Sequence, residues 1–386
     1  MAEMTSRERV WAAVNHEEPD RVPLDLGGGG STTLVVEAYQ RLEAFWGLPR
    51  REPRIMSKAF RLAYLEEEAL VRLGSDTRPL GVKGFSRTPS PTGDPDTFRD
   101  AWGVVWRRAQ YPGGYYWELH GHPLAEATVS DLDRYPWPDP LDPALTAGLA
   151  EEVQALRAGP YAIMADGGFK SFWELGYMLR GLEQLLVDLV ADPEFVTALM
   201  EKLLELNLAG TRRFLEIAGP HIQVFRAADD LATQNGLLIS PEAYRAVLKP
   251  VYKRYFDQVH ALTPAKLFYH SCGCVNELVG DLVEIGVDIL NPVQVTAMGD
   301  TARLKERFGS QVTFWGAIDT QEVLPHGTPA DVEREVAHRI HDLAPGGGYV
   351  VASVHNVQPD VPPENLLAMT AAVRKHGRYP LARSGG

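Results

Sequence analysis

Cysteine is scarce in this chain of 386 residues: there are two, Cys272 and Cys274. Two cysteines this close together cannot cross-link distant parts of the chain, so a disulfide framework is excluded and a metal or redox role is favoured. Long apolar runs are missing too, and no stretch of about 18 apolar residues is available to span a bilayer. The first residues lack the apolar segment of a secretory signal. We therefore expect a cytoplasmic protein.

Positive charge is also in deficit. Lysine and arginine number 38 against 51 aspartates and glutamates, which gives a formal net charge of −13. Sequence-independent binding to nucleic acid or to an anionic membrane depends on positive fields, so we expect neither partner. The other fractions, 45% hydrophobic and 23% charged, are those of an ordinary globular protein. We expect one domain over residues 1–386, and the oligomeric state stays open, a homodimer included.

A short apolar run followed by a longer amphipathic stretch recurs along the chain, which favours β–α units around a parallel sheet. Eight runs are typical of strands: 21–26, 76–82, 161–166, 222–227, 265–270, 287–291, 312–318 and 349–354. Helices are predicted between them, among them 6–15, 34–46, 62–73, 144–157, 193–217, 241–261, 301–308 and 329–343. This series predicts a (β/α)8 TIM barrel, although an open doubly wound sheet accommodates the same alternation.

Residues 85–123 interrupt this alternation. They are rich in aromatic and turn residues, and Pro112-Gly113-Gly114 is a turn signal. We expect a β-hairpin excursion from the barrel near residues 85–123.

The sequence His270-Ser-Cys272 ends the fifth predicted strand. Residues two apart on a strand project to the same side, so the imidazole and the thiol can converge, and both are ligands that zinc prefers. His355, after the last strand, is the candidate third ligand, which leaves an open position typical of catalytic zinc. The alternative is a hydrogen-bonded histidine beside a small buried cysteine. Cys274 is a fourth ligand, a neighbouring thiol or a packing residue.

Other polar residues follow the predicted strands, where TIM barrels place functional groups. Asp229 and Asp230 form either an acid–base pair, in which one pKa is raised, or a turn cap. The glycine run Gly27–Gly30 follows the first strand without the lysine of a phosphate-binding fingerprint. We expect a mobile loop there rather than a phosphate cradle.

Several stretches resemble the uroporphyrinogen-decarboxylase-like superfamily, and they lie in the family order along nearly the whole chain. They are SRERVWAAVNHEEPDRVP at 6–23, DDLATQ at 229–234, ISPEAY at 239–244, HSCG at 270–273, GVDILNPVQ at 286–294 and DVPPEN at 360–365. True decarboxylases of this superfamily use no cofactor and bind their polycarboxylate substrate through arginines in an early R-Q-A-G-R-Y type motif. This chain has LDLGGGG at 24–30 instead, which disfavours tetrapyrrole decarboxylation because the charge partners are missing.

The second branch, the corrinoid-linked methyltransferases, includes methylcobalamin:coenzyme M methyltransferases and O-demethylase components. Its members carry H-x-C on one strand and a third zinc ligand on the last. The resemblance therefore implies zinc on His270, Cys272 and His355, although the best-known members have cysteine where this chain has His355. It further implies methyl transfer between cobalt and a thiol or a methoxy/phenolic substrate, with the corrinoid, methylcobalamin, supplied by a separate partner protein.

In this hypothesis further residues have assigned roles. The catalytic candidates are Asp229, Asp230 and Asp319; the substrate-binding candidates are Asp25, Gln234, Asn291, Gln294 and Trp315. Two other functions remain as alternatives: a uroporphyrinogen-decarboxylase-type lyase and a non-catalytic barrel that binds a small ligand.

Overall fold

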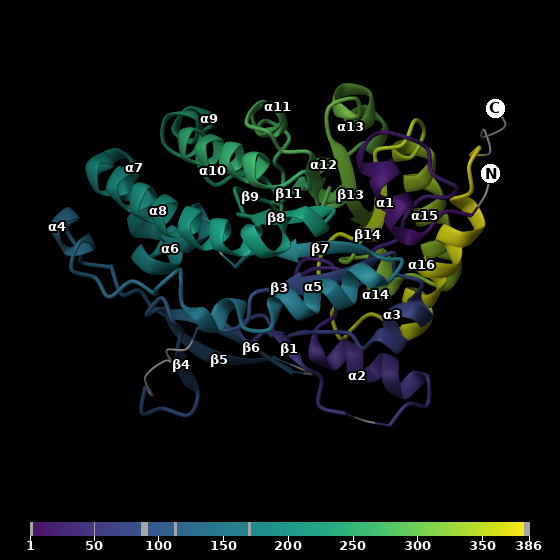
Figure 1. Ribbon diagram of the computed structural model, residues 1–386, viewed down its shortest axis with the longest axis horizontal. Coiled ribbons are helices and arrows are strands. Elements are labelled where there is room, and N and C mark those ends of the chain that lie inside the picture. Colours follow the sequence, from purple (N-terminus) through teal and green to yellow (C-terminus); the bar gives the residue numbers. More distant parts are fainter. Residues whose placement is uncertain (1–2, 50, 86–91, 112–113, 169–170, 382–386) are drawn as a thin grey trace.

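The computed structural model describes residues 3–49, 51–85, 92–111, 114–168 and 171–381 (Figure 1). Its centre is a curled parallel sheet in the order β14-β13-β12-β11-β8-β7-β3. These strands are β3 (Thr77–Gly81), β7 (Ala162–Asp166), β8 (Val224–Ala228), β11 (Lys266–His270), β12 (Ile289–Asn291), β13 (Thr313–Ile318) and β14 (Tyr349–Ser353). Each lies within one residue of a predicted strand or inside it.

Residues 22–26 close this sheet into a barrel. Leu24 forms a parallel bridge with Val351 of β14, and the Asp25 N–H donates to the Val351 carbonyl at 2.9 Å. On the other side, the Asp76 N–H donates to the Leu24 carbonyl at 2.8 Å. The first predicted strand therefore lies where a barrel requires it, but it pairs through one bridge because Pro23 has no N–H to donate. The TIM-barrel prediction is confirmed, and an open sheet is excluded.

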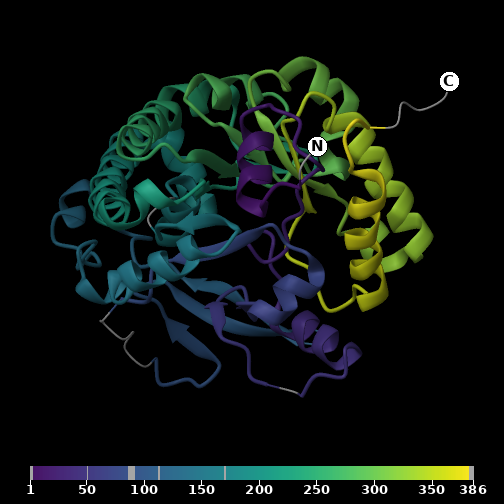
Figure 2. The same cartoon turned by 45° about the vertical axis from the view of Figure 1, so that its right-hand side comes forward.

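Helices surround the barrel (Figure 2), and in the described part of the chain none is both long and apolar enough to cross a membrane. They are α1 (Ser6–Val14), α2 (Val36–Phe45), α3 (Glu67–Leu73), α4 (Val129–Leu132), α5 (Leu149–Ala158), α6 (Trp173–Arg180), α7 (Leu182–Ala191), α8 (Pro193–Ala218), α9 (Pro241–Ala243), α10 (Lys249–Leu262), α11 (Val279–Glu284), α12 (Val295–Met298), α13 (Thr301–Phe308), α14 (Val323–His326), α15 (Pro329–Leu343) and α16 (Pro363–His376). Short 3-10 turns cover Pro143–Thr146 and Gly219–His221.

Three predicted helices need correction. The helix expected over 144–157 begins only at Leu149, because a 3-10 turn at Pro143–Thr146 and the left-handed residue Gly148 precede it. The helix expected over 62–73 begins only at Glu67, because Leu62–Ala63 is strand β2, paired antiparallel with β1 (Ile55–Ser57). The helix expected over 241–261 is divided by a π-helical turn at Tyr244–Leu248. Pro250 follows this turn in the first residues of α10, and it has no N–H for a regular helical hydrogen bond.

The excursion is a three-stranded antiparallel sheet of β4 (Thr97–Arg99), β5 (Val105–Tyr111) and β6 (Gly114–Gly121). The predicted hairpin is confirmed, while Pro112 and Gly113 of its turn lie outside the described residues. Trp106 of β5 meets Phe60 edge to face at 6.3 Å between ring centroids. The excursion thereby packs against the loop between β1 and β2.

The barrel interior is apolar, and α1 closes the end at which the strands begin. Side chains of α1 pack into one buried cluster with inward-facing residues of the strands. The members are Val10, Ala13, Val14, Ala162, Met164, Val224, Phe268, Ile289, Trp315, Val350 and Ala352. Figure 2 shows α1, in purple, lying across the centre of the ring of helices. Functional groups are therefore left to the opposite end, the mouth formed by the carboxyl ends of the strands.

Asp76 holds the closing segment in place. Its fully buried carboxylate accepts hydrogen bonds from the Leu24 N–H at 2.9 Å, from Arg9 at 2.8 Å, and from Arg21 at 2.8 and 2.9 Å. One side chain thus ties α1, the first strand segment and β3 together.

We expect Asp76→Ala to lower the free energy of unfolding by about 3–5 kcal/mol, because it leaves two arginines without their buried partner. Urea denaturation followed by circular dichroism measures this. Lys202→Ala, which breaks the largely exposed pair with Glu205, is the control and should change stability by less than about 0.5 kcal/mol. Equal losses in the two variants would contradict the assignment.

Candidate metal centre

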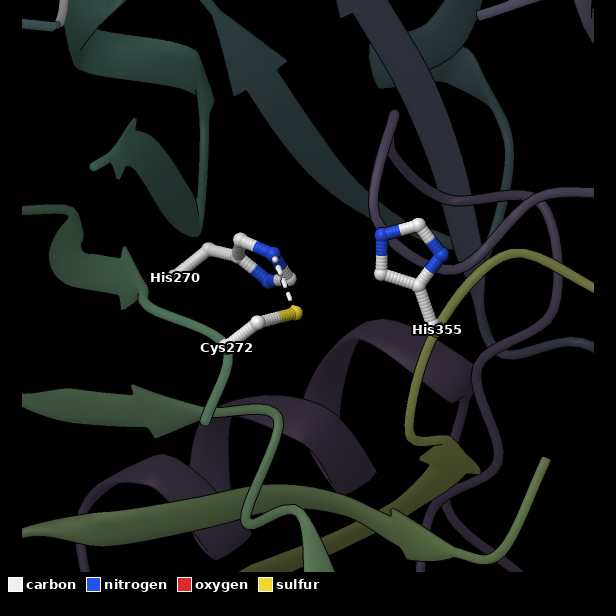
Figure 3. A group of neighbouring side chains, drawn as sticks. All are labelled: His270, Cys272 and His355. Atoms are coloured by element: carbon white, nitrogen blue, oxygen red, sulfur yellow. Dashed lines mark hydrogen bonds between the residues drawn. The ribbon is translucent and has the colours of Figure 1, made fainter. Parts of the chain in front are cut away.

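Three side chains converge at the barrel mouth. His270 is the last residue of β11, Cys272 follows two residues later, and His355 follows β14. Figure 3 shows His270 and Cys272 on one segment, with His355 facing them from across the site. Their ligand atoms all lie within 4.8 Å of one another, and His270 Nε2 is 3.3 Å from Cys272 Sγ. Among the described residues, Cys274 does not belong to this group.

Asn291 fixes the ring of His270. The Asn291 amide nitrogen donates to the Trp315 carbonyl at 2.8 Å, so its Oδ1 is left to accept from His270 Nδ1. Nδ1 therefore carries the proton, and the lone pair of Nε2 points toward Cys272. This arrangement of a ligand histidine held by a hydrogen-bond acceptor is the one that metal sites use to orient their ligands.

The turn that carries Cys272 is held from two sides. The Cys272 N–H donates to Asp230 Oδ1 at 2.8 Å, and the Gly273 N–H donates to Gln294 Oε1 at 2.8 Å. Gly273 has φ +86°, and a Cβ there would lie 2.5 Å from the Thr233 carbonyl. Only glycine fits this position, which lets the turn pack against β9 (Ala232–Thr233).

Burial sets the protonation of the three groups. It lowers the pKa of His270 to about 4 and also lowers the pKa of His355, so both imidazoles are neutral at pH 7. Burial, with the nearby carboxylates of Asp230 and Glu174, raises the pKa of the Cys272 thiol. A bound divalent cation would oppose that rise, because a coordinated thiol is deprotonated.

The donor set fits zinc. Two neutral imidazoles and one thiol are typical zinc ligands, and three protein ligands leave a position for a reactant. Ligand atoms around one zinc ion lie roughly 3.5 Å apart, whereas these three lie within 4.8 Å of one another. Side-chain movements of about 1 Å would therefore bring all three atoms to one ion. His355 borders the open volume of the pocket, which leaves room for this movement.

A pocket of about 400 Å³ opens above these ligands. The barrel, the glycine loop and the β1–β2 hairpin all contribute to its wall. Its lining includes His270, His355, Asp230, Arg226, Asp166, Glu174, Lys83, Met56, Phe60, Tyr64 and the loop Gly28–Ser31. A concave, partly apolar site with a few convergent polar groups is the usual form of a small-molecule site.

The side chains of the two adjacent aspartates, Asp229 and Asp230, point to different parts of the structure. Asp230 lines the pocket, and its Oδ1 lies 3.9 Å from His270 Nε2. The Asp229 carboxylate turns to the start of α6, where it accepts from the Phe172 N–H at 2.6 Å and the Ser171 hydroxyl at 2.7 Å. The pKa of Asp229 is raised to about 6, but the cause is burial and not its neighbour.

The other candidates lie outside the lining of this pocket. Asp25 and Trp315 are buried together, with the indole N–H donating to Asp25 at 2.9 Å. Gln294 supports Gly273, and Asp319 accepts from the Gln321 N–H at 2.8 Å after β13. Gln234 is exposed in the turn between β9 and β10 (Gly236–Leu237). Asn291 acts on His270. The structure thus brings Asp230 close to the three candidate metal ligands, and it places these other residues around them.

Arg226 lines the pocket but is not among the site residues predicted from the sequence. It lies in the middle of β8, within the run VFRAA, and is only 8% exposed. A charged residue inside an otherwise apolar strand is the signal that points to it, since such a residue is rarely buried without a partner.

The fold and the site define a TIM-barrel protein with a candidate metal centre at its mouth. Residues 120–376 match the family described as Uroporphyrinogen decarboxylase (URO-D), and the chain belongs to that family. The resemblance predicted from the sequence motifs is confirmed at this level.

Individual relatives are distant. Uroporphyrinogen decarboxylase of Alkalilimnicola ehrlichii is 24% identical over 263 residues, 66% of this chain and 68% of that protein. The enzyme of the same name from Escherichia coli is 24% identical over 276 residues, 68% and 73% of the two chains. A solved structure of a methyltransferase from Methanosarcina mazei has the same fold: it superposes with a TM-score of 0.66 at 19% identity and covers 97% of this chain and 99% of its own.

We expect Asn291→Ala to weaken zinc binding by about 10- to 100-fold, because the ring of His270 loses the acceptor that orients it. Competition with a chromophoric chelator measures the affinity. Asn276→Ala is the matched control, since that amide donates to the Met298 carbonyl away from the ligands, and it should bind zinc like the unaltered protein. Unchanged affinity in Asn291→Ala would rule out its positioning role.

Proposed function

We propose that this protein is a zinc-dependent methyltransferase that moves a methyl group between the cobalt of a corrinoid and a thiol or a methoxy/phenolic substrate. The observation that carries the proposal is the convergence of His270, Cys272 and His355 within 4.8 Å at the barrel mouth. Its likeness in fold to a protein named as a methyltransferase supports it.

The residues of the chain have distinct parts in this proposal. His270, Cys272 and His355 would hold zinc, which when bound lowers the pKa of a thiol or polarises an ether oxygen. Asn291 keeps the lone pair of His270 Nε2 directed at the site. Asp230 binds the Cys272 N–H with Oδ1 and lines the pocket, where its carboxylate would accept the proton that a thiol substrate loses.

The corrinoid would be presented by a separate protein. A pocket of about 400 Å³ lies near the lower end of the range for drug-sized ligands, and a corrinoid is larger than such ligands. The macrocycle would therefore approach the mouth of the pocket, while the small substrate occupies the pocket.

The charge of the pocket argues against tetrapyrrole decarboxylation. Among the described lining residues, Lys83 and Arg226 are the cations, against the carboxylates of Asp166, Glu174 and Asp230. Arg226 is itself paired with Asp166 at 3.1 Å. A substrate with many carboxylates needs several cationic partners, and this lining does not supply them. The shared family with the decarboxylases still makes that activity the alternative to test.

The purified protein is expected to bind one zinc ion per chain, measured by elemental analysis after dialysis. Cys272→Ala should lose the metal, because a three-ligand site cannot spare one donor. Cys274→Ala removes the other thiol of the same turn and should keep it. Equal zinc contents in the two variants would refute the ligand assignment.

With free methylcobalamin and a panel of small thiols, the zinc-loaded protein should consume the methylcobalamin absorbance. The sulfur gains the methyl group, and the electron pair of the Co–C bond stays on cobalt. His355→Ala should slow this reaction at least about 100-fold, because the thiol then lacks its activating ion. Conversion of uroporphyrinogen by metal-free protein would instead establish a decarboxylase. Binding of a small molecule without any turnover would establish a ligand-binding barrel.

A further inference from the structure

Arg226 forms the floor between the apolar barrel interior and the pocket. It pairs in register with Phe268 of β11, a member of the interior cluster, and its side chain also lines the pocket. The guanidinium crosses the barrel to the loop after the first strand segment, where Nε and Nη2 donate to Ser31 Oγ at 3.0 and 2.6 Å. Nη1 donates to Asp166 Oδ2 at 3.1 Å.

The hydrogen bonds of Arg226 leave two donors over. A guanidinium has five N–H groups, and these contacts use three. The other two have no acceptor among the described residues, although the side chain is only 10% exposed. Burial lowers the pKa of Arg226 to about 10, which still keeps it charged at pH 7. A buried, charged donor of this kind calls for an oxygen ligand.

The glycine loop adds donors beside Arg226. Gly28–Ser31 line the same pocket, and a Cβ on Gly30 would lie 3.9 Å from Arg226 Nη1. Within the described part of the chain, the backbone N–H groups of Gly29, Gly30 and Ser31 donate to no residue. Unpaired N–H groups on consecutive residues are a common way to bind an anion.

Hydrogen bonds hold this loop on both sides, although the sequence favours a mobile loop there. The Gly28 N–H and the Thr32 hydroxyl donate to Asp25 at 2.9 and 2.7 Å, and Asn356 donates to the Gly30 carbonyl at 2.7 Å. A Cβ on Gly28 would lie 2.2 Å from Thr77 Oγ1. The glycines allow the backbone to pack this closely.

We propose that Arg226 and the backbone of Gly29–Ser31 form a carboxylate-binding subsite of this pocket. This inference rests on the proposed function and narrows its substrate: a small molecule with a thiol or ether at the metal end and a carboxylate at the other. The planar guanidinium suits a carboxylate, which can accept two parallel N–H groups. Asp166 stays bonded to Nη1, so the subsite takes a single carboxylate and not a polyanion.

The test compares two thiols of the same shape by calorimetry on the zinc-loaded protein. We expect 3-mercaptopropionate to bind roughly 10- to 100-fold tighter than neutral 3-mercaptopropionamide, as one charged hydrogen-bonded group contributes. Arg226→Gln should abolish this preference by weakening the acid alone. Lys58→Gln, which removes a cation of the β1–β2 hairpin that does not line the pocket, should leave both affinities within about twofold. Equal affinities for the two thiols in the unaltered protein would overturn the subsite.

Propionate, which has no thiol, separates this inference from the proposed function. Its binding, followed by ligand-observed NMR, should disappear in Arg226→Gln and persist in Cys272→Ala. That pattern in a protein without zinc would keep the subsite and remove the metal-dependent function. Zinc-dependent binding of both thiols with no preference for the acid would keep the metal-dependent function and remove the subsite. If Arg226→Gln does not fold, Ser31→Ala, which removes the acceptor of two Arg226 hydrogen bonds, should reduce the preference for the acid.

Discussion

A buried chain of hydrogen bonds connects the two ends of the pocket. Asp25 accepts from Trp315, the Trp315 carbonyl accepts from Asn291, and Asn291 accepts from His270. The same Asp25 also binds the Gly28 N–H. His270, a candidate metal ligand, and the glycine loop are therefore positioned by one network, and buried polar networks of this kind are costly unless every member is satisfied. Residues that look like substrate ligands in the sequence act here on other residues of the site.

The barrel and the ligand pair are predictable from the sequence for simple reasons. Strands covered by helices read as continuous apolar runs, and the spacing of His270 and Cys272 puts both on one side of a strand end. His355 is found because the last strand of a barrel returns to the first. The direction of a side chain after a strand ends is not encoded in spacing, so Asp229 and Asp230 could not be told apart. Arg226 is not predicted as a site residue because the hydrophobic pattern of a strand does not show whether a buried charged side chain lines a pocket.

The positive charge on the floor of the pocket comes from a barrel strand and not from the loop that follows the first strand segment. That loop, Gly27–Gly30, carries no charged residue, and the cation is Arg226 of β8. Its position within a strand buries the charge, where Ser31 and Asp166 bind it. Barrels accept changes in pocket residues because the strands fix the scaffold while the loop ends vary.

Helix α1 closes one end of the barrel, so the pocket has a single opening at the carboxyl ends of the strands. Val10, Ala13 and Val14 of α1 fill the closed end, and Arg226 lies between this apolar layer and the pocket. In the proposed function, a small substrate bound on this floor would therefore enter through the mouth of the pocket before a larger reactant covers it. Its product would likewise be the last to leave.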